Sequence, residues 1–149
     1  MKREPLGKWI SILYRHSMMY ANEFLKDYEI NAGQLPFFIN IIENPGITQE
    51  ELSKKLRIDK STTAKSIKVL IKKGYLTRKV SREDKRVHLL YPTEKAIQVK
   101  EVIFKRAFEW DEDVLLKGFS EDEKRCAYDL LRRITQNCLE YFEKKEMEG

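Results

Sequence analysis

Hydrophobic positions recur at spacings of three and four along most of the chain, which is the period of amphipathic helices. The pattern predicts a first helix from Leu6 to about Tyr28. A second begins at the capping motif Asn31-x-x-Gln34 and ends at Asn44-Pro45-Gly46, because proline and glycine stop helices. The stripe of the first helix consists of Trp9, Ile12, Leu13, His16, Tyr20 and Phe24.

Two further helices are separated by a tight turn. Thr48-x-x-Glu51 is a capping box that opens a helix over residues 49–56. After a short connection, Asp59 is a suitable N-cap for a helix from Lys60 to about Lys73. Gly74 suits the left-handed position that ends helices. Two helices joined in this way predict a helix-turn-helix.

From Tyr75 onward the pattern changes to two short strands, over residues 75–81 and 86–91, around a polar tip. Thr93 then caps a long helix, and Ser120-x-x-Glu123 caps the last one. We therefore predict a mainly α fold: a winged helix-turn-helix with a small antiparallel β-hairpin wing, flanked by N- and C-terminal dimerisation helices. The expected regions are 1–30, 31–92 and 93–149.

The distribution of charge along the chain indicates a type of binding partner. The chain has a formal net charge of +5, yet residues 48–92 hold 13 Lys and Arg against 5 Asp and Glu, and the remainder is slightly acidic. A positive middle section indicates a polyanion met by one part of the fold. Lysines also keep small domains in solution, so charge alone leaves nucleic acid and plain solubility open.

Several function classes are disfavoured by what the sequence lacks. It has no apolar run of membrane-spanning length and no secretion signal at its N-terminus, so we expect no membrane association and a cytoplasmic location. There is no glycine-rich phosphate loop and no nucleophile paired with a base, so neither catalysis nor a cofactor is expected. With His16 and His88 as the histidines, we expect no metal site.

The helix from Lys60 has two faces of different chemistry. Thr63, Ile67, Leu70 and Ile71 are expected to pack inward. The outward face is small, hydroxylated and basic, which suits contact with base edges and phosphates of double-stranded DNA. A solvated surface helix is the alternative, but successive hydroxyl residues are poor helix formers and favour the DNA interpretation. The predicted contacts are Ser61, Thr62, Lys65 and Lys68.

The hairpin tip carries a second basic group. Arg82, Lys85 and Arg86 surround an acidic pair, and a basic tip of this kind can reach a minor groove. An exposed hairpin protected from aggregation by its charges is the alternative. Because phosphate would repel Asp84, we expect its carboxylate to pair with Arg86 or Arg78 and structure the wing.

Together these residues resemble the multiple-antibiotic-resistance regulator (MarR) family. The signature is Arg78, then five residues, then Asp84-Lys85-Arg86, with Thr93 after an apolar strand. The preceding Pro-Gly-Ile-Thr-Gln-Glu-Glu-Leu also resembles that family, as does Gly74-Tyr75-Leu76. The motifs span about residues 34–93. Ala96 departs from the pattern, at a position where glycine is common.

The resemblance implies a dimeric winged-helix transcriptional regulator, usually a repressor released by a small ligand or by oxidation. By position, Ser61, Thr62 and Lys65 match major-groove contacts of the family. Arg82 and Lys85 match wing-tip positions, and Asp84 and Arg86 match the ion-pair and DNA-facing positions of the wing.

The terminal helices have apolar faces broader than the reading unit alone covers, so we expect a homodimer on a pseudo-palindromic operator. A pocket for a small aromatic or lipophilic effector is expected between those helices and the reading unit. The alternative, which the pattern favours, is that its aromatic residues belong to the core. The expected wall is His16, Tyr20, Phe24 and Phe38, with Phe37 and Tyr75 beside them.

Two alternatives to a DNA-binding regulator with a ligand remain at this stage. One is a winged-helix module that binds another protein. The other is a thiol-based redox sensor, for which an exposed cysteine is required. Cys138 lies on the apolar stripe of the last helix and is expected to pack, whereas Cys126 is expected to be partly exposed.

Overall fold

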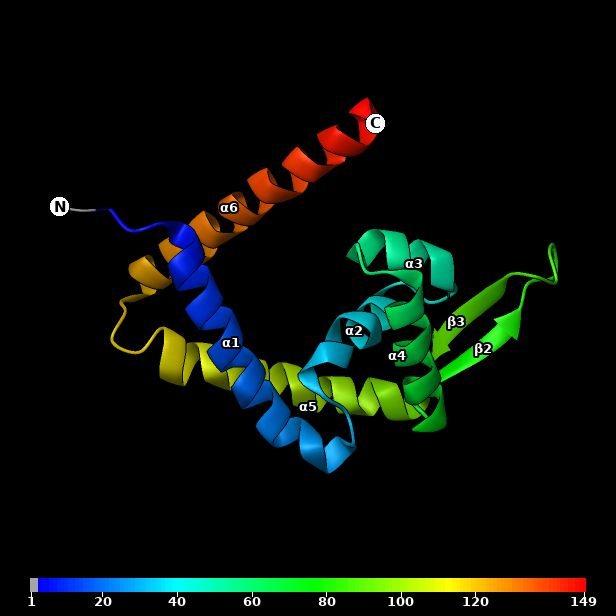
Figure 1. The fold of residues 1–149 in the computed structure, drawn as a ribbon. Coiled ribbons are helices and arrows are strands. Elements are labelled where there is room, and N and C mark those ends of the chain that lie inside the picture. Colours follow the sequence, from blue (N-terminus) through cyan, green and yellow to red (C-terminus); the bar gives the residue numbers. More distant parts are fainter. Residues whose placement is uncertain (1–2) are drawn as a thin grey trace. The chain divides into compact units, whose positions relative to one another are not determined.

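The computed structural model describes residues 3–149 and is mainly helical, as predicted (Figure 1). The chain divides into two compact units, one ending at Lys105 and one formed by Arg106–Gly149. The first unit combines the predicted N-terminal helix with the winged helix-turn-helix. Helix α5 (Glu94–Trp110) contains the boundary between the units.

The first unit opens with α1 (Leu6–Leu25), the 3₁₀ turns η1 (Lys26–Tyr28) and η2 (Ala32–Gln34), and α2 (Leu35–Glu43). Helix α1 is slightly shorter than predicted. Its last predicted turn tightens to η1, and Glu29 then takes a left-handed backbone with φ 56°. The capping box at Asn31 is confirmed: its backbone N–H donates to Gln34 Oε1 at 3.1 Å, and its Oδ1 accepts from Gln34 N–H at 3.2 Å.

The helix-turn-helix consists of α3 (Gln49–Leu56) and α4 (Lys60–Lys72). The predicted capping box of α3 is present, since Thr48 Oγ1 accepts from Glu51 N–H at 3.1 Å and Glu51 Oε2 accepts from Thr48 N–H at 2.9 Å. In the turn, Arg57 is left-handed with φ 53°. The buried Ser53 hydroxyl donates to the Ile58 carbonyl at 2.6 Å, so the turn is fixed from inside.

The wing is the hairpin of β2 (Leu76–Val80) and β3 (His88–Pro92), which pair antiparallel from Leu76↔Pro92 to Val80↔His88. Both predicted strands are confirmed with shifted ends. A third strand, β1 (Ile47–Thr48), pairs with the other edge of β3 and gives the order β1-β3-β2. It was not predicted because two residues are too few to show an alternating pattern.

The core of the first unit is formed by the inward faces of α1, α2, α3, α4 and α5 and by the sheet. The Tyr75 hydroxyl donates to the Tyr28 carbonyl at 2.7 Å, and the Tyr75 ring meets Phe38 edge-on. The largest fully buried side chains are Tyr75, Phe37, Phe38, Leu25, Ile41, Leu52, Ile67, Leu70, Leu76, Leu90 and Thr63.

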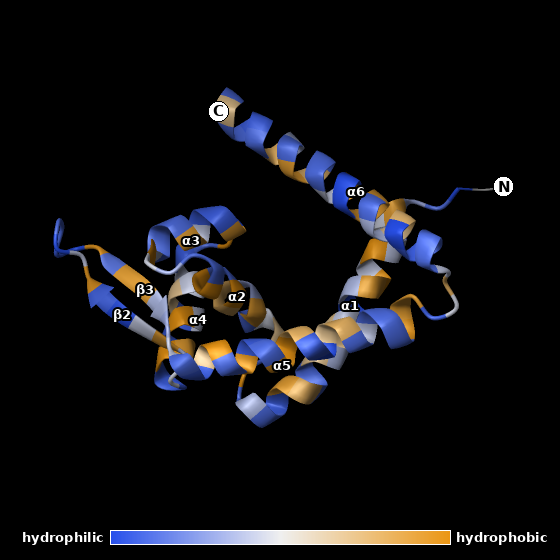
Figure 2. Cartoon of the chain, turned by 180° about the vertical axis from the view of Figure 1, so that it is seen from behind, coloured by the Kyte–Doolittle hydropathy of each residue, from blue (hydrophilic) through white to orange (hydrophobic). Residues whose placement is uncertain are grey.

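The second unit continues from the end of α5 through a π-helical segment, η3 (Asp111–Leu115), to α6 (Glu121–Glu148). The capping box of Ser120 and Glu123 at the start of α6 is confirmed. Residues 128–149 are all exposed, and Figure 2 shows hydrophobic stretches recurring along this helix. Among the described residues, no helix is both long enough and apolar enough to cross a bilayer.

Both cysteines lie on α6 and both are exposed. The expectation that Cys138 packs is therefore wrong for the single chain. The physical reason is that no other described part of the second unit covers the apolar stripe of α6 around Cys138.

Candidate nucleic-acid interface

The start of α4 is held by the Asp59 side chain. Asp59 Oδ1 accepts from the Thr62 backbone N–H at 2.8 Å, and Oδ2 accepts from the Thr62 hydroxyl at 2.7 Å. The predicted N-cap is confirmed. These two bonds, the backbone one first, lower the pKa of Asp59, so the carboxylate is ionised at neutral pH.

Helix α4 divides into two faces. Thr63, Ile67 and Leu70 are fully buried, as predicted, and Ile71 is half-buried. All four predicted contact residues are exposed: Ser61, Thr62, Lys65 and Lys68. The run of hydroxyl residues also has a local cause, because Thr62 takes part in the cap and the buried Thr63 hydroxyl donates to the Asp59 carbonyl at 2.9 Å.

The tip of the wing is closed by hydrogen bonds around Asp84. The Ser81 N–H donates to the Val87 carbonyl at 2.8 Å, and the Val87 N–H donates to the Asp84 carbonyl at 3.0 Å. The Ser81 hydroxyl oxygen accepts from the N–H groups of Glu83 and Asp84 at 3.3 and 3.5 Å. Backbone hydrogen bonds and the Ser81 hydroxyl therefore close the loop, and the Asp84 side chain remains available to orient a neighbour.

Of the two arginines expected to pair with Asp84, the structure selects Arg86. Its backbone N–H and Nε donate to Asp84 Oδ1 at 3.0 and 3.2 Å, and its Nη2 donates to Oδ2 at 3.2 Å. These bonds, led by those of the side chain, lower the pKa of Asp84. Such an exposed pair adds little stability, so its effect is to orient the guanidinium. Arg82, Lys85 and Arg86 are all exposed at the tip.

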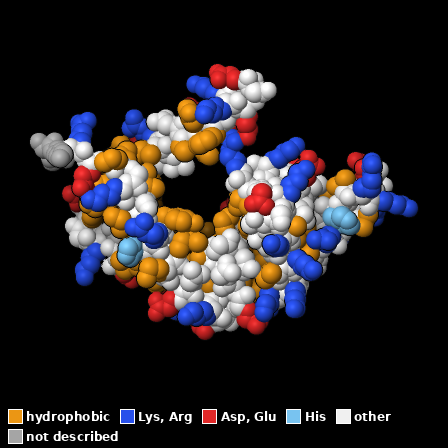
Figure 3. All heavy atoms as spheres, in the orientation of Figure 1, with side chains coloured by type: hydrophobic (Ala, Val, Ile, Leu, Met, Phe, Trp, Pro, Cys, Tyr) orange, Lys and Arg blue, Asp and Glu red, His pale blue; other side chains and the backbone are white. Residues whose placement is uncertain are grey.

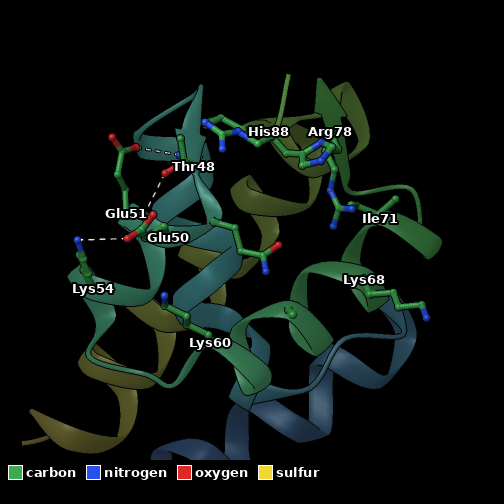
Figure 4. Close-up of a pocket in the computed structure, with 13 residues that line it drawn as sticks. Thr48, Glu50, Glu51, Lys54, Lys60, Lys68, Ile71, Arg78 and His88 are labelled. Atoms are coloured by element: carbon green, nitrogen blue, oxygen red, sulfur yellow. Dashed lines mark hydrogen bonds and ion pairs between the residues drawn. The ribbon is translucent and has the colours of Figure 1, made fainter. Parts of the chain in front are cut away.

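Among the described residues, Arg78 forms no ion pair with Asp84. It is exposed on β2 and lines a groove of about 970 Å³ between α3, α4 and the wing (Figure 4). The two acidic side chains of the groove both have partners: Glu50 lies 3.4 Å from Lys54, and Glu51 belongs to the capping box. The lining is Thr48, Gln49, Glu50, Glu51, Lys54, Lys60, Ala64, Lys68, Ile71, Arg78, Arg86, Val87 and His88.

Lys54, Lys60 and His88 were not predicted to belong to this surface. They come from three different elements, and the sequence alone does not bring those elements together. A partial signal existed for α4, since Lys60, Ala64 and Lys68 are each four residues apart and lie along one side of the helix. Figure 3 shows Lys and Arg side chains spread over the surface formed by α3, α4 and the wing.

The residues expected to wall an effector pocket are not alike in their surroundings. Phe38 is fully buried, as are Phe37 and Tyr75, which fits the alternative that these residues form the core. His16 is exposed, with its Nδ1 2.8 Å from the Ile12 carbonyl. Tyr20 and Phe24 are half-buried and meet edge-on, with ring centroids 5.6 Å apart.

Comparisons with known proteins agree with this geometry. The family model described as MarR family matches residues 28–87. The HTH-type transcriptional regulator YybA of Bacillus subtilis is 33% identical over 128 residues, which is 86% of this chain and 85% of the relative. The chain belongs to the MarR family.

Solved structures of MarR-family members superpose over most of the chain. A MarR transcriptional regulator from Methanosarcina mazei Go1 matches with a TM-score of 0.85 and 34% identity, covering 91% of this chain and 97% of the other. A MarR-family regulator from Listeria monocytogenes, complexed with a 26mer DNA, matches with a TM-score of 0.77 and 33% identity over 91% and 89% of the two chains. The protein is thus a winged helix-turn-helix transcriptional regulator and not an enzyme.

Proposed function

We propose that this MarR-family regulator acts as a homodimeric repressor on a pseudo-palindromic operator, with α4 in the major groove and the wing in the adjacent minor groove. The observation that carries the proposal is the hydroxylated and basic face of α4, anchored by Asp59 beside a basic wing ordered by Asp84. The Listeria relative was solved in complex with a 26mer DNA, which supports DNA as the partner of this fold. The proposed contacts are Ser61, Thr62, Lys65, Lys68, Arg82, Lys85 and Arg86.

The two groups of contacts have different tasks. Lys65 and Lys68 carry donors suited to guanine O6 and N7, and the hydroxyls of Ser61 and Thr62 are short enough to meet base edges directly. The wing arginines supply positive charge that a narrow minor groove attracts. The α4 face therefore supplies sequence preference, and the wing supplies affinity and register.

Substitutions on the two surfaces separate these tasks. We expect Lys65→Ala to weaken binding and change the preferred half-site, because a base contact is lost. Arg82→Ala should weaken binding to all sequences evenly. Selection of bound DNA from a random pool, followed by affinity measurements on the selected duplexes, distinguishes the two effects. Lys144→Ala removes an exposed lysine near the end of α6 and is the control for loss of charge.

Binding should also weaken by about 10³-fold or more between roughly 50 and 200 mM salt, since phosphate contacts release counterions. If Lys65→Ala and Arg82→Ala bind every duplex equally well, the reading surface lies elsewhere. If the protein does not bind duplex DNA even at low salt, the result would instead favour a module that contacts another protein.

For regulation, we propose a small aromatic or lipophilic effector that releases the operator and contacts the half-buried pair Tyr20 and Phe24. Residues that leave apolar surface half-open provide area for such a ligand. A compound that dissociates the wild-type complex in a library screen should fail on Tyr20→Ala and Phe24→Ala. Tyr14→Ala, which changes an exposed tyrosine of the same helix, should keep the response. Retained release in both pocket variants would place the effector at another site.

A further inference from the structure

If α4 reads DNA as proposed above, the hydrogen bonds between Asp59 and Thr62 at its start also affect which bases it prefers. We propose that Asp59 fixes the Thr62 hydroxyl as an acceptor toward DNA. Thr62 then selects a base that presents an amino group in the major groove, adenine or cytosine, and disfavours guanine and thymine at one position of each half-site.

The argument starts from the direction of one hydrogen bond. Thr62 Oγ1 lies 2.7 Å from Asp59 Oδ2, while the Thr62 N–H holds the other carboxylate oxygen at 2.8 Å. An ionised carboxylate only accepts hydrogen bonds. The hydroxyl proton of Thr62 must therefore point to Asp59, and this charge-assisted bond is stronger than one between neutral groups.

What remains of the Thr62 hydroxyl is its pair of acceptor sites. Thr62 is exposed on the same side of α4 as Lys65, so these sites face outward from the reading surface. In the major groove, adenine N6 and cytosine N4 donate, whereas guanine O6 and thymine O4 accept. An acceptor placed against O6 or O4 leaves both oxygens without a donor.

The same hydrogen bond to Asp59 disfavours a phosphate as the partner of Thr62. Phosphate oxygens only accept, and the hydroxyl has no proton left to donate to them. The neighbouring Asp59 carboxylate also repels a phosphate. A base edge with an amino group is thus the DNA feature that complements this pair.

Ser61 provides an internal contrast. It is the residue before Thr62 and is also exposed, but Asp59 is bonded by the backbone of Ser61 and by the hydroxyl of Thr62, so the Ser61 hydroxyl is not held by the carboxylate. A free hydroxyl rotates and either donates or accepts. Ser61 therefore lacks the preference that we assign to Thr62.

The test uses full-length protein and selection of bound duplexes from a random pool. Wild type should prefer adenine or cytosine over guanine or thymine at one half-site position by about tenfold in affinity. Thr62→Val keeps the shape and removes the acceptor, so the preference should disappear. Thr62→Ser should retain it. Ser61→Ala, at another proposed contact, should lower overall affinity while the preference at this position remains, and Lys144→Ala on α6 should change neither.

Asp59→Asn gives the sharper result. Asparagine is as good an N-cap as aspartate, so α4 should begin normally, which circular dichroism checks. Its amide N–H₂ can donate to Thr62 Oγ1 and release the hydroxyl proton toward DNA. The preference at this position should then move toward guanine or thymine.

A chemical control removes the amino group itself. Purine substituted for adenine at the selected position should weaken wild-type binding by about tenfold and leave Thr62→Val nearly unaffected. Two results overturn this inference alone. One is sequence-specific binding in which no half-site position prefers adenine or cytosine, and the other is an Asp59→Asn variant that keeps the wild-type preference. Wild-type binding without any sequence preference contradicts the proposed function instead.

Discussion

At the scale of single residues, Tyr75 shows how burial changes the role that the sequence suggests. It was placed beside an expected ligand pocket, but its side chain is 1% exposed and its hydroxyl donates to the Tyr28 carbonyl at 2.7 Å. Lys95 Nζ lies 4.4 Å from the ring centroid and donates to the Lys73 carbonyl at 2.7 Å. Tyr75 therefore connects η1, which follows α1, to the end of α4.

This role gives Tyr75 a pH-dependent effect on stability. Burial, followed by the nearby Glu29 charge, raises the pKa of the phenol above its ordinary value. The folded state thus holds the proton more tightly than the unfolded state. The contribution is complete below pH of about 10 and is lost as pH rises through the folded pKa.

We expect Tyr75→Phe to lower the free energy of unfolding by about 1–2 kcal/mol at neutral pH, because the Tyr28 carbonyl loses its donor. The alkaline loss of stability should also be smaller in the variant than in wild type. Urea unfolding at neutral and alkaline pH measures both effects. Tyr14→Phe, at a side chain that is 63% exposed, should change neither, and an equal loss in the two variants would contradict the assigned role.

Which residues of α4 face outward was predictable, since helical spacing alone separates the buried Thr63 and Ile67 from the exposed Lys65. The partner of Asp84 was not predictable from the sequence. Both Arg78 and Arg86 were compatible with the sequence, and the choice depends on the turn geometry that places Arg86 N–H 3.0 Å from the carboxylate.

At the scale of elements, the sequence predicted best where a side chain ends or begins a helix. The capping boxes at Asn31, Thr48 and Ser120 are local, so the sequence contains all their partners. Strand β1 and the π-helical η3 are different, because a two-residue strand depends on pairing with β3 and η3 depends on how its neighbours pack. Neither leaves a periodic pattern in the chain.

The wing is the element whose order depends most directly on one side chain. Asp84→Asn and Glu83→Gln each remove one negative charge from its tip. Charge alone would make both variants bind DNA more tightly. Asp84→Asn also weakens the bonds that orient Arg86, so we expect it to bind the operator about three- to tenfold more weakly than Glu83→Gln.

Fluorescence anisotropy with one operator duplex measures this difference. The unfolding free energy should be nearly the same in both variants, because the Asp84–Arg86 pair is exposed. Matching affinities would mean that the wing position is set by the backbone hydrogen bonds of Ser81 and Val87 alone.

At the scale of the whole molecule, the exposed apolar stripe of α6 is the largest feature that the single chain does not explain. Its side chains lie at helical spacings of three and four, and residues 128–149 are all exposed. Contiguous apolar surface of this kind marks an interface in most proteins. The stripe consists of Leu130, Leu131, Ile134, Cys138, Tyr141 and Phe142.

We expect a second copy of the chain to cover this stripe. Charges introduced by the double substitution Leu131→Glu and Ile134→Glu would be buried in such an interface, so the variant should have the mass of one chain in analytical ultracentrifugation. Each half-site is then bound independently. Affinity for the full operator should fall by about 10²-fold or more, because the second binding event is no longer intramolecular.

A matched variant separates this effect from added charge. Gln136→Glu with Lys144→Gln lowers the charge of the same helix by two, as the stripe variant does, without changing an apolar side chain, and it should remain dimeric and keep operator affinity within about threefold. Both side chains replaced in the stripe variant are exposed, at 58% and 40%, so the single chain should keep its helical content. A stripe variant that still sediments as two chains would place the dimer interface elsewhere, with the apolar face of α1 as the next surface to alter.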